Sequence, residues 1–272
     1  MSLYSRRRRL IALSALGALS AGLALPHLAL AQTPAADPFD GDPFKSFLWP
    51  DLRRAYLGAG AVVFDERVRV LLPAFAEDPM NVPVTVTTAG LARIERIVVL
   101  VDRNPIRKVL EYEPLAADAS VSFRFKLEQA SPVRAAARTA DGVWHVGGAL
   151  VDSAGGGCTV SGATRQDGSW SKSLGLVSAR VYPSSPAPDA GARLRLRVMH
   201  PMDTGLVGGV PAFFVTKLSV RDADGRELLR LHTYEPVSEN PVFSFDFGRA
   251  PPGPLRVVGN DNNGNRIDST VE

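Results

Sequence analysis

The sequence predicts an all-β fold, with two immunoglobulin-like β-sandwich domains joined by a flexible, glycine-rich loop that carries a cysteine. Apolar and polar residues alternate over short runs in both halves of the chain, which is the period of a half-buried strand. Turn dipeptides such as Asp141-Gly142 and Asn263-Gly264 separate several of these runs, as they do in β-hairpins. Between the two halves, residues 153–175 are rich in glycine and serine and follow neither period, which indicates a linker.

The first 31 residues have the pattern of a secretory signal peptide. Arg6–Arg9 form a basic start, an apolar run extends from Leu10 to Leu25, and Ala29-Leu30-Ala31 is a small-x-small cleavage site before Gln32. The paired arginines also fit a twin-arginine export signal, which would mark a bacterial protein, and an ordinary Sec signal is the alternative. We therefore expect cleavage after Ala31 and a location in the periplasm.

Removal of this leader changes the charge of the protein. All four charged residues before Gln32 are arginines, so the net charge falls from +3 to −1. A nearly neutral mature chain gives no support for nucleic acid or an anionic membrane as a partner. No second apolar run has membrane-spanning length, and the mature product is therefore expected to be soluble.

Residues 32–60 are expected to form an N-terminal extension. It begins with a proline- and aspartate-rich stretch, and its later part, 44–57, carries spaced apolar residues that indicate a short helix packed on the first domain. The first sandwich, 61–152, has period-two patterns and β-branched runs but no pattern of a helix of three or more turns. Its predicted strands include 82–86, 94–101, 121–127, 133–139 and 143–151.

The second sandwich is predicted over residues 176–272, after the linker at 153–175. Leu194, Leu196 and Val198 alternate with arginines, and the three phenylalanines at 243, 245 and 247 share one face. Asp224-Gly225 divides two further apolar runs as a hairpin turn would. The predicted strands include 194–198, 213–221, 227–233, 243–247, 255–260 and 267–271.

Cys158 is the only cysteine of the chain, and it follows Gly155, Gly156 and Gly157 in the linker. A single thiol cannot form an internal disulfide, and free thiols of exported proteins tend to be oxidised or capped. Glycine reaches backbone conformations with positive φ at little cost, so these three glycines are expected to form a mobile arm. We therefore expect a reachable thiol that acts as a nucleophile in its thiolate form, and in air an intermolecular disulfide as a side product.

The motifs of the chain resemble the two halves of the Sox sulfur-carrier complex, SoxY and SoxZ, joined in one polypeptide. The first half is similar to SoxY at Leu71–Asp78, Val82–Val86, Asn104-Pro105 and Gly156-Gly157-Cys158. The second half is similar to SoxZ at His200–Gly205, Glu239-Asn240-Pro241 and Asp261–Gly264. One departure is that the arm of free-standing SoxY ends the chain, whereas here Thr159 and the second domain follow the cysteine.

This resemblance implies a periplasmic, non-enzymatic carrier, of the type associated with quinoprotein dehydrogenases. Cys158 would hold sulfur intermediates, such as those of thiosulfate oxidation, as covalent thiol adducts, and the three glycines would give the arm its freedom. The implied partners are sulfur-oxidising enzymes or a quinoprotein dehydrogenase with its cytochrome, and no cofactor or metal is implied. The alternative function is an interaction or maturation module for such a dehydrogenase, in which Cys158 is incidental or redox-sensing.

Other constellations suggest weaker hypotheses. Met199, His200 and Met202 offer soft metal ligands, although packing at the end of a strand explains them better. A cysteine hydrolase would need a histidine beside Cys158, and no local signature links the thiol to the histidines at 145, 200 or 232. The arginines at 193, 195 and 197 share one side of a predicted strand, as a solvated surface or as a stripe that docks a partner.

Overall fold

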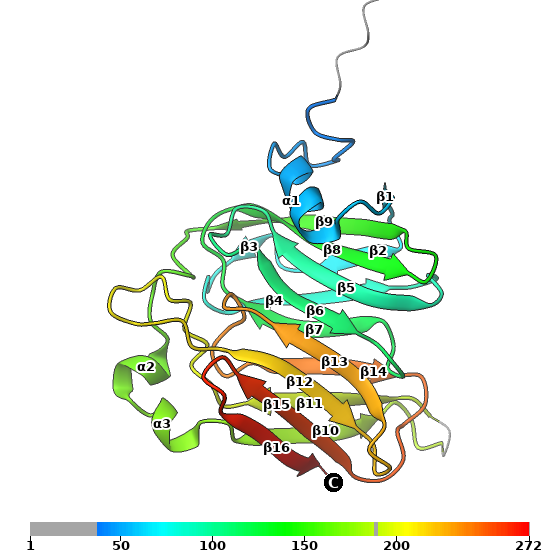
Figure 1. Cartoon of the computed structure of the whole chain (residues 1–272), viewed down its shortest axis with the longest axis vertical. Helices are drawn as coiled ribbons and strands as arrows, with labels where there is room; N and C mark the ends of the chain where they lie inside the picture. The colour runs from blue at the N-terminus through cyan, green and yellow to red at the C-terminus, as the bar shows by residue number, and fades with distance from the viewer. Residues whose placement is uncertain (1–36, 188–189, 272) are drawn as a thin grey trace, which may run out of the picture. The chain divides into compact units, whose positions relative to one another are not determined.

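The strands form two sheets, and each sheet takes strands from both halves of the chain (Figure 1). The structure is a computed structural model that describes residues 37–187 and 190–271, so the predicted signal peptide lies outside the described residues. Within this part of the chain, no helix has both the length and the apolar character needed to cross a bilayer. The predicted all-β fold is confirmed.

The larger sheet has ten strands. Its order is β1 (Val62–Phe64), β9 (Trp144–Ser153), β8 (Ser131–Thr139), β5 (Ile94–Val101), β6 (Lys108–Glu113), β13 (Glu227–Thr233), β12 (Val215–Arg221), β15 (Leu255–Asp261) and β16 (Arg266–Val271), with β3 (Phe75–Ala76) paired to β9. The smaller sheet has six strands, in the order β10 (Val177–Pro183), β11 (Ala192–Val198), β14 (Val242–Phe247), β7 (Ser120–Phe125), β4 (Val82–Thr88) and β2 (Val68–Leu71).

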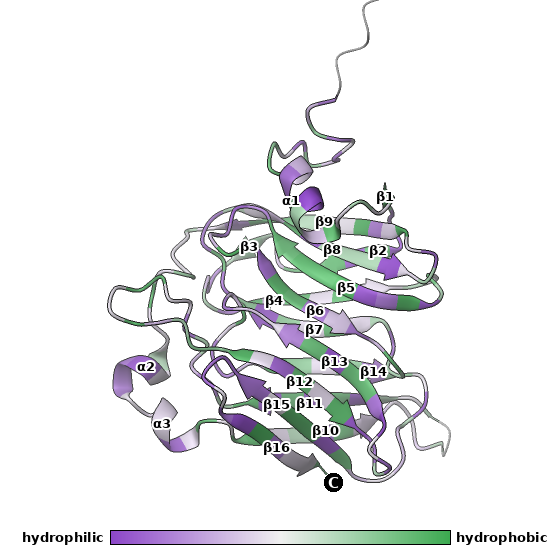
Figure 2. Ribbon diagram, viewed as in Figure 1, coloured by the Kyte–Doolittle hydropathy of each residue, from purple (hydrophilic) through white to green (hydrophobic). Residues whose placement is uncertain are grey.

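Period-two patterning explains how these strands pack. Along β11, Leu194, Leu196 and Val198 are buried while the arginines between them are exposed, and the same alternation of green and purple runs along several strands in Figure 2. The inward residues of both sheets belong to one hydrophobic core. Each fully buried side chain of this size stabilises the fold by about 1.5–3 kcal/mol before the entropy of ordering it is counted. The hairpins expected at Asp141-Gly142 and Asn263-Gly264 are present.

Two antiparallel strand pairs join the halves edge to edge. In the ten-stranded sheet β13 pairs with β6, and in the six-stranded sheet β14 pairs with β7. The ring of Tyr112 on β6 stacks on Phe245 of β14 with 5.5 Å between centroids, and Arg230 forms an ion pair with Glu113 at 2.8 Å. The two predicted sandwiches therefore share both sheets and one core. The alternation of apolar residues within a strand does not predict this sharing, because it does not say which strands pair.

The N-terminal extension is fixed by a buried arginine. Arg134 on β8 binds Asp42 and Asp102 with hydrogen bonds of 2.6–2.8 Å, and all three side chains have no solvent exposure. The guanidinium also lies 4.6 Å from the ring centroid of Trp49, the first residue of α1 (Trp49–Leu57). This helix falls inside the region where a short helix was expected, and its buried face packs on the outer side of the ten-stranded sheet.

The predicted linker is more ordered than expected. Residues 153–175 include two short helices, α2 (Ala163–Asp167) and α3 (Trp170–Ser173). Arg165 of α2 forms an ion pair with Asp203, and the Thr164 amide donates to Glu239 at 2.8 Å. The expectation of a flexible linker was wrong for this part, because side chains of the second half supply anchors that are distant in sequence.

Replacing Arg134 with methionine is predicted to destabilise the fold by about 3–5 kcal/mol, because two buried carboxylates lose the counter-charge that binds both of them. Urea unfolding at neutral pH measures this change. The control is Arg193→Met, which removes an exposed arginine from its ion pair with Asp246 and should cost no more than about 1 kcal/mol. Equal effects of the two substitutions would contradict the structural role of the buried arginine.

Candidate functional site around Cys158

Cys158 is buried, with 1% of its surface exposed. It lies at the end of the arm that leaves β9, as the sequence indicated, but its thiol does not face solvent. The expectation of a freely reachable thiol is wrong for this conformation, because residues from both halves of the chain close around the arm. The position of the cysteine was predictable, and its enclosure was not.

The glycines of the arm permit close packing. Gly156 and Gly157 donate their amides to the carbonyl oxygens of Glu128 and Leu127, at 3.1 and 3.0 Å. A Cβ on Gly157 would lie 2.1 Å from the Pro79 carbonyl oxygen, so only glycine fits there. Gly155 and Gly156 have φ values of 91° and 86°, which residues with a side chain rarely adopt. These glycines were expected to form a mobile arm. In this conformation the arm is instead hydrogen-bonded and packed.

Glu128 holds the arm on the side of the first half. Its carboxylate accepts the Cys158 amide at 2.9 Å and the Thr159 hydroxyl at 3.0 Å. The buried side chain of Asn104 positions this segment, because its amide nitrogen donates to the Lys126 carbonyl at 2.7 Å and its oxygen accepts the Glu128 amide at 2.8 Å. Asn104 thus has a structural role next to the cysteine.

The loop His200–Gly205 closes the site from the second half. The Thr204 hydroxyl donates to the Cys158 carbonyl oxygen at 2.6 Å. The buried ammonium of Lys126 donates to the Met202 carbonyl oxygen. The enclosure of the thiol therefore depends on contacts that cross between the two halves.

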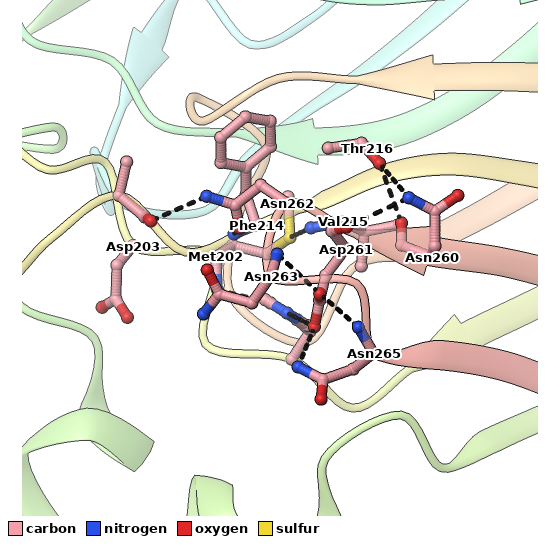
Figure 3. Close-up of polar contacts among 12 residues, drawn as sticks. Met202, Asp203, Phe214, Val215, Thr216, Asn260, Asp261, Asn262, Asn263 and Asn265 are labelled. Carbon is pink, nitrogen blue, oxygen red and sulfur yellow. Dashed lines mark hydrogen bonds and ion pairs between the residues drawn. The ribbon is translucent and has the colours of Figure 1, made fainter.

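Polar contacts within the second half fix the shape of this loop. The Met202 amide donates to Nδ1 of His200 at 3.1 Å, and the Met202 sulfur accepts the Val215 amide at 3.3 Å. Figure 3 shows the neighbouring turn, in which the Asp261 carboxylate accepts hydrogen bonds from Asn263 and Asn265. Nε2 of His200 lies 3.5 Å from Asp261, too far for a good hydrogen bond, and has no other partner among the described residues.

Two family models match the chain. The model described as sulfur oxidation protein SoxY covers residues 53–158, and the one described as sulphur oxidation protein SoxZ covers 180–272. The chain joins a SoxY domain to a SoxZ domain. The SoxY match ends at the buried cysteine, and the SoxZ match contains the loop that closes over it. Both descriptions name sulfur oxidation and support a role as a sulfur carrier in that process.

A search of solved structures gives the sulfur carrier protein SoxY from Chlorobium limicola f thiosulfatophilum. This structure is 20% identical and has a TM-score of 0.35, and the match covers 38% of this chain and 88% of that one. No curated protein matches the sequence.

The surroundings of the thiol in the SoxY domain disfavour its charged form. Burial raises the pKa of Cys158 to about 12, the negative charge of Glu128 adds to this shift, and Lys126 opposes it. The Cys158 sulfur lies 3.6 Å from the Lys126 carbonyl oxygen, to which the thiol donates. Burial also lowers the pKa of the Lys126 ammonium. At neutral pH the enclosed cysteine is therefore a protonated thiol and a weak nucleophile.

The metal-site and cysteine-hydrolase hypotheses receive no support from the contacts. His200 and Met202 use Nδ1 and the sulfur to accept backbone amides within the SoxZ domain. His145 bonds to Asp65 at 2.8 Å, and no hydrogen bond joins any histidine to Cys158 in the described part of the chain. Sequence reasoning missed Lys126 and Glu128. Lys126 directly follows β7 and is out of phase with the inward residues of that strand, so alternation pointed to an exposed side chain, whereas Lys126 is buried.

The enclosed thiol is predicted to react with iodoacetamide at least about 100-fold more slowly in the folded protein than in urea at the same pH, because few molecules carry a reachable thiolate. Thr204→Val removes the hydroxyl that holds the Cys158 carbonyl and should speed the reaction of the folded protein several-fold. Thr88→Val is the matched control, since this threonine bonds to the Ala119 carbonyl oxygen away from the site. Labelling as fast in the folded as in the unfolded protein would contradict the enclosure.

The stability of the protein is predicted to fall as the pH drops from about 6.5 to about 4. Burial lowers the pKa of His200 from 6.5 to about 4, with Asp261 opposing, so the unfolded state binds more protons in this window. The free energy of unfolding falls by about 3 kcal/mol at most, and His200 causes no such fall above about pH 6.5. Urea unfolding across this range, compared with His200→Asn, isolates the contribution. A variant with an unchanged pH dependence would contradict the assignment.

Proposed function

We propose that the protein is a periplasmic, non-enzymatic carrier that holds sulfur intermediates covalently on Cys158 and presents them to sulfur-oxidising enzymes. The observation that carries this proposal is the position of Cys158. The one cysteine of the chain lies at the end of the SoxY match, and Thr204 of the SoxZ domain binds its carbonyl oxygen. The leader at 1–31 supports the periplasmic location.

Loading would form a bond between the Cys158 sulfur and the outer sulfur of a thiosulfate ion. The thiol loses its proton, and two electrons pass to an acceptor in the partner enzyme, such as a cytochrome, which leaves a thiosulfonate on the cysteine. The protein contributes the anchoring sulfur and no catalytic group. Transfer between enzymes then benefits from the high local concentration of a tethered group.

The closed arm must open before this chemistry begins. Opening breaks the hydrogen bonds of Glu128 to Cys158 and Thr159 and the bond of Thr204 to the Cys158 carbonyl. Thr159 is exposed and Glu128 is half-buried, so the bond between these two residues is accessible to solvent and to a docking partner, whereas the Thr204 bond is buried. Once the sulfur leaves the buried position, its pKa falls toward the ordinary range and the thiolate becomes available.

Tetrathionate provides a test without the loading enzyme. It reacts with a thiol to leave a thiosulfonate on the cysteine and to release thiosulfate and a proton. Intact mass under non-reducing conditions should show one such adduct on the wild type, faster loading of Thr204→Val and no adduct on Cys158→Ser. The serine variant should keep the melting temperature of the wild type nearly unchanged. Adducts on the serine variant, or none on Thr204→Val, would exclude Cys158 as the carrier.

The burial of Cys158 favours one alternative, an interaction or maturation module for a periplasmic quinoprotein dehydrogenase or its cytochrome. In that case the cysteine is a packed side chain or a redox sensor. Co-purification with the dehydrogenase that survives Cys158→Ala, with dehydrogenase activity unchanged, would favour the module over the carrier.

A further inference from the structure

An open groove of about 710 Å³ lies on the outer face of the six-stranded sheet. Four exposed arginines line it, Arg124 from β7, Arg180 from β10, and Arg195 and Arg197 from β11. We call this surface the arginine groove. It carries a concentration of positive charge that the net charge of the mature chain does not suggest.

The charges of these arginines are not compensated within the sheet. Arg193, which lies on β11 but outside the groove, faces Asp246 on β14 and binds it at 2.7 and 3.0 Å. Arg195 instead lies between Ser244 on one side and Arg180 on the other. Like charges directly opposite each other destabilise a strand pair, so the fold carries a local electrostatic cost here. Such a cost is recovered when a negatively charged partner binds.

Arg197 also has no acidic neighbour on the adjacent strands. Its neighbours across the strand pairs are Ser178 and Val242, and neither can balance its charge. None of the four groove arginines forms an ion pair within residues 37–187 and 190–271. The Arg180 guanidinium lies 5.2 Å from the ring centroid of Tyr182, which also lines the groove.

The two carboxylates at the rim bind other groups of the protein. Glu239 accepts the Thr164 amide at 2.8 Å and the Thr164 hydroxyl. Asp78 accepts the Met80 amide at 2.9 Å and the Asn81 side chain at 2.8 Å. These partners are neutral, so both carboxylates keep their charge, and four arginines against two carboxylates leave the groove a net positive charge.

The groove adjoins a partly apolar hollow. This hollow of about 280 Å³ shares Arg124 and Arg195 with it and is lined on its other side by Leu71, Leu72 and Pro73. Arginine, tyrosine and apolar side chains together are typical of protein interfaces, in which arginine is enriched. A small oxoanion would need a compact set of converging donors, whereas this surface suits an extended chain.

We propose that the arginine groove docks an acidic segment of a partner protein. The groove adjoins the cysteine arm, because Thr164 lies six residues after Cys158 and Asp78 precedes Pro79, whose carbonyl oxygen packs on Gly157. A segment bound there would lie beside the contacts that close the arm. The docking proposal does not depend on the proposed carrier function. Only the further step, in which this partner loads or unloads the thiol, rests on that function.

A fluorescein-labelled hexaglutamate peptide is the probe, and fluorescence anisotropy at low ionic strength measures its binding to the mature protein. The combined variant Arg180→Ser, Arg195→Ser and Arg197→Ser should weaken binding by at least about tenfold, since it removes three exposed charge contacts. Cys158→Ser should bind as the wild type does. This last result keeps the docking proposal separate from a failure of the carrier function.

The control carries the same change of charge elsewhere. It combines Arg54→Ser, Arg138→Ser and Arg256→Ser, which remove exposed arginines that already have carboxylate partners. This variant should bind the peptide within about twofold of the wild type, because surface ion pairs leave little charge free. Equal loss in both variants would show a response to net charge alone and overturn the proposal. If sulfate displaces the peptide and chloride at equal ionic strength does not, the groove binds a small oxoanion. That result would also overturn the proposal.

Discussion

Two strand pairs, β6 with β13 and β7 with β14, hold the second half of the chain where its loop closes over Cys158. They join the SoxY and SoxZ domains edge to edge and bring Tyr112 against Phe245 in a shared core. Lys126 directly follows β7, and its ammonium reaches the loop His200–Gly205 of the SoxZ domain. A change of register in either pair would separate Thr204 from the cysteine. The chemistry of the thiol thus depends on backbone pairing between the domains.

The closed site gives a physical account of a carrier at rest. Burial and the charge of Glu128 keep the sulfur protonated, so it reacts slowly with oxidants. The bonds that close the arm are few, and one of them ends at the exposed hydroxyl of Thr159. On the proposed carrier function, opening would break these bonds, none of which is a pairing between strands of either sheet. A partner that binds beside the arm could supply the free energy for this change.

Alternation of apolar residues predicted the strands and hairpins, because the side chains of a sheet record burial residue by residue. It could not predict the pairing of the domains, which depends on residues more than 100 positions apart, such as Glu113 and Arg230. The motifs singled out Cys158 and the His200–Gly205 loop, and the structure brings the two together through the bond between Thr204 and the Cys158 carbonyl. Burial of the thiol was not predictable, since glycine permits both motion and close approach. The contacts that decide between them, such as those of Glu128 and Thr204, come from residues distant in sequence.

The chain runs without interruption from β9 through the cysteine to β10, so one polypeptide supplies both domains. Two separate subunits held by the same contacts would dissociate as their concentration fell. Within a single chain each domain meets the other at an effective concentration in the millimolar range, roughly as for short linkers in general. Dilution through a cell compartment therefore leaves the pair intact, with one copy of each domain in every molecule.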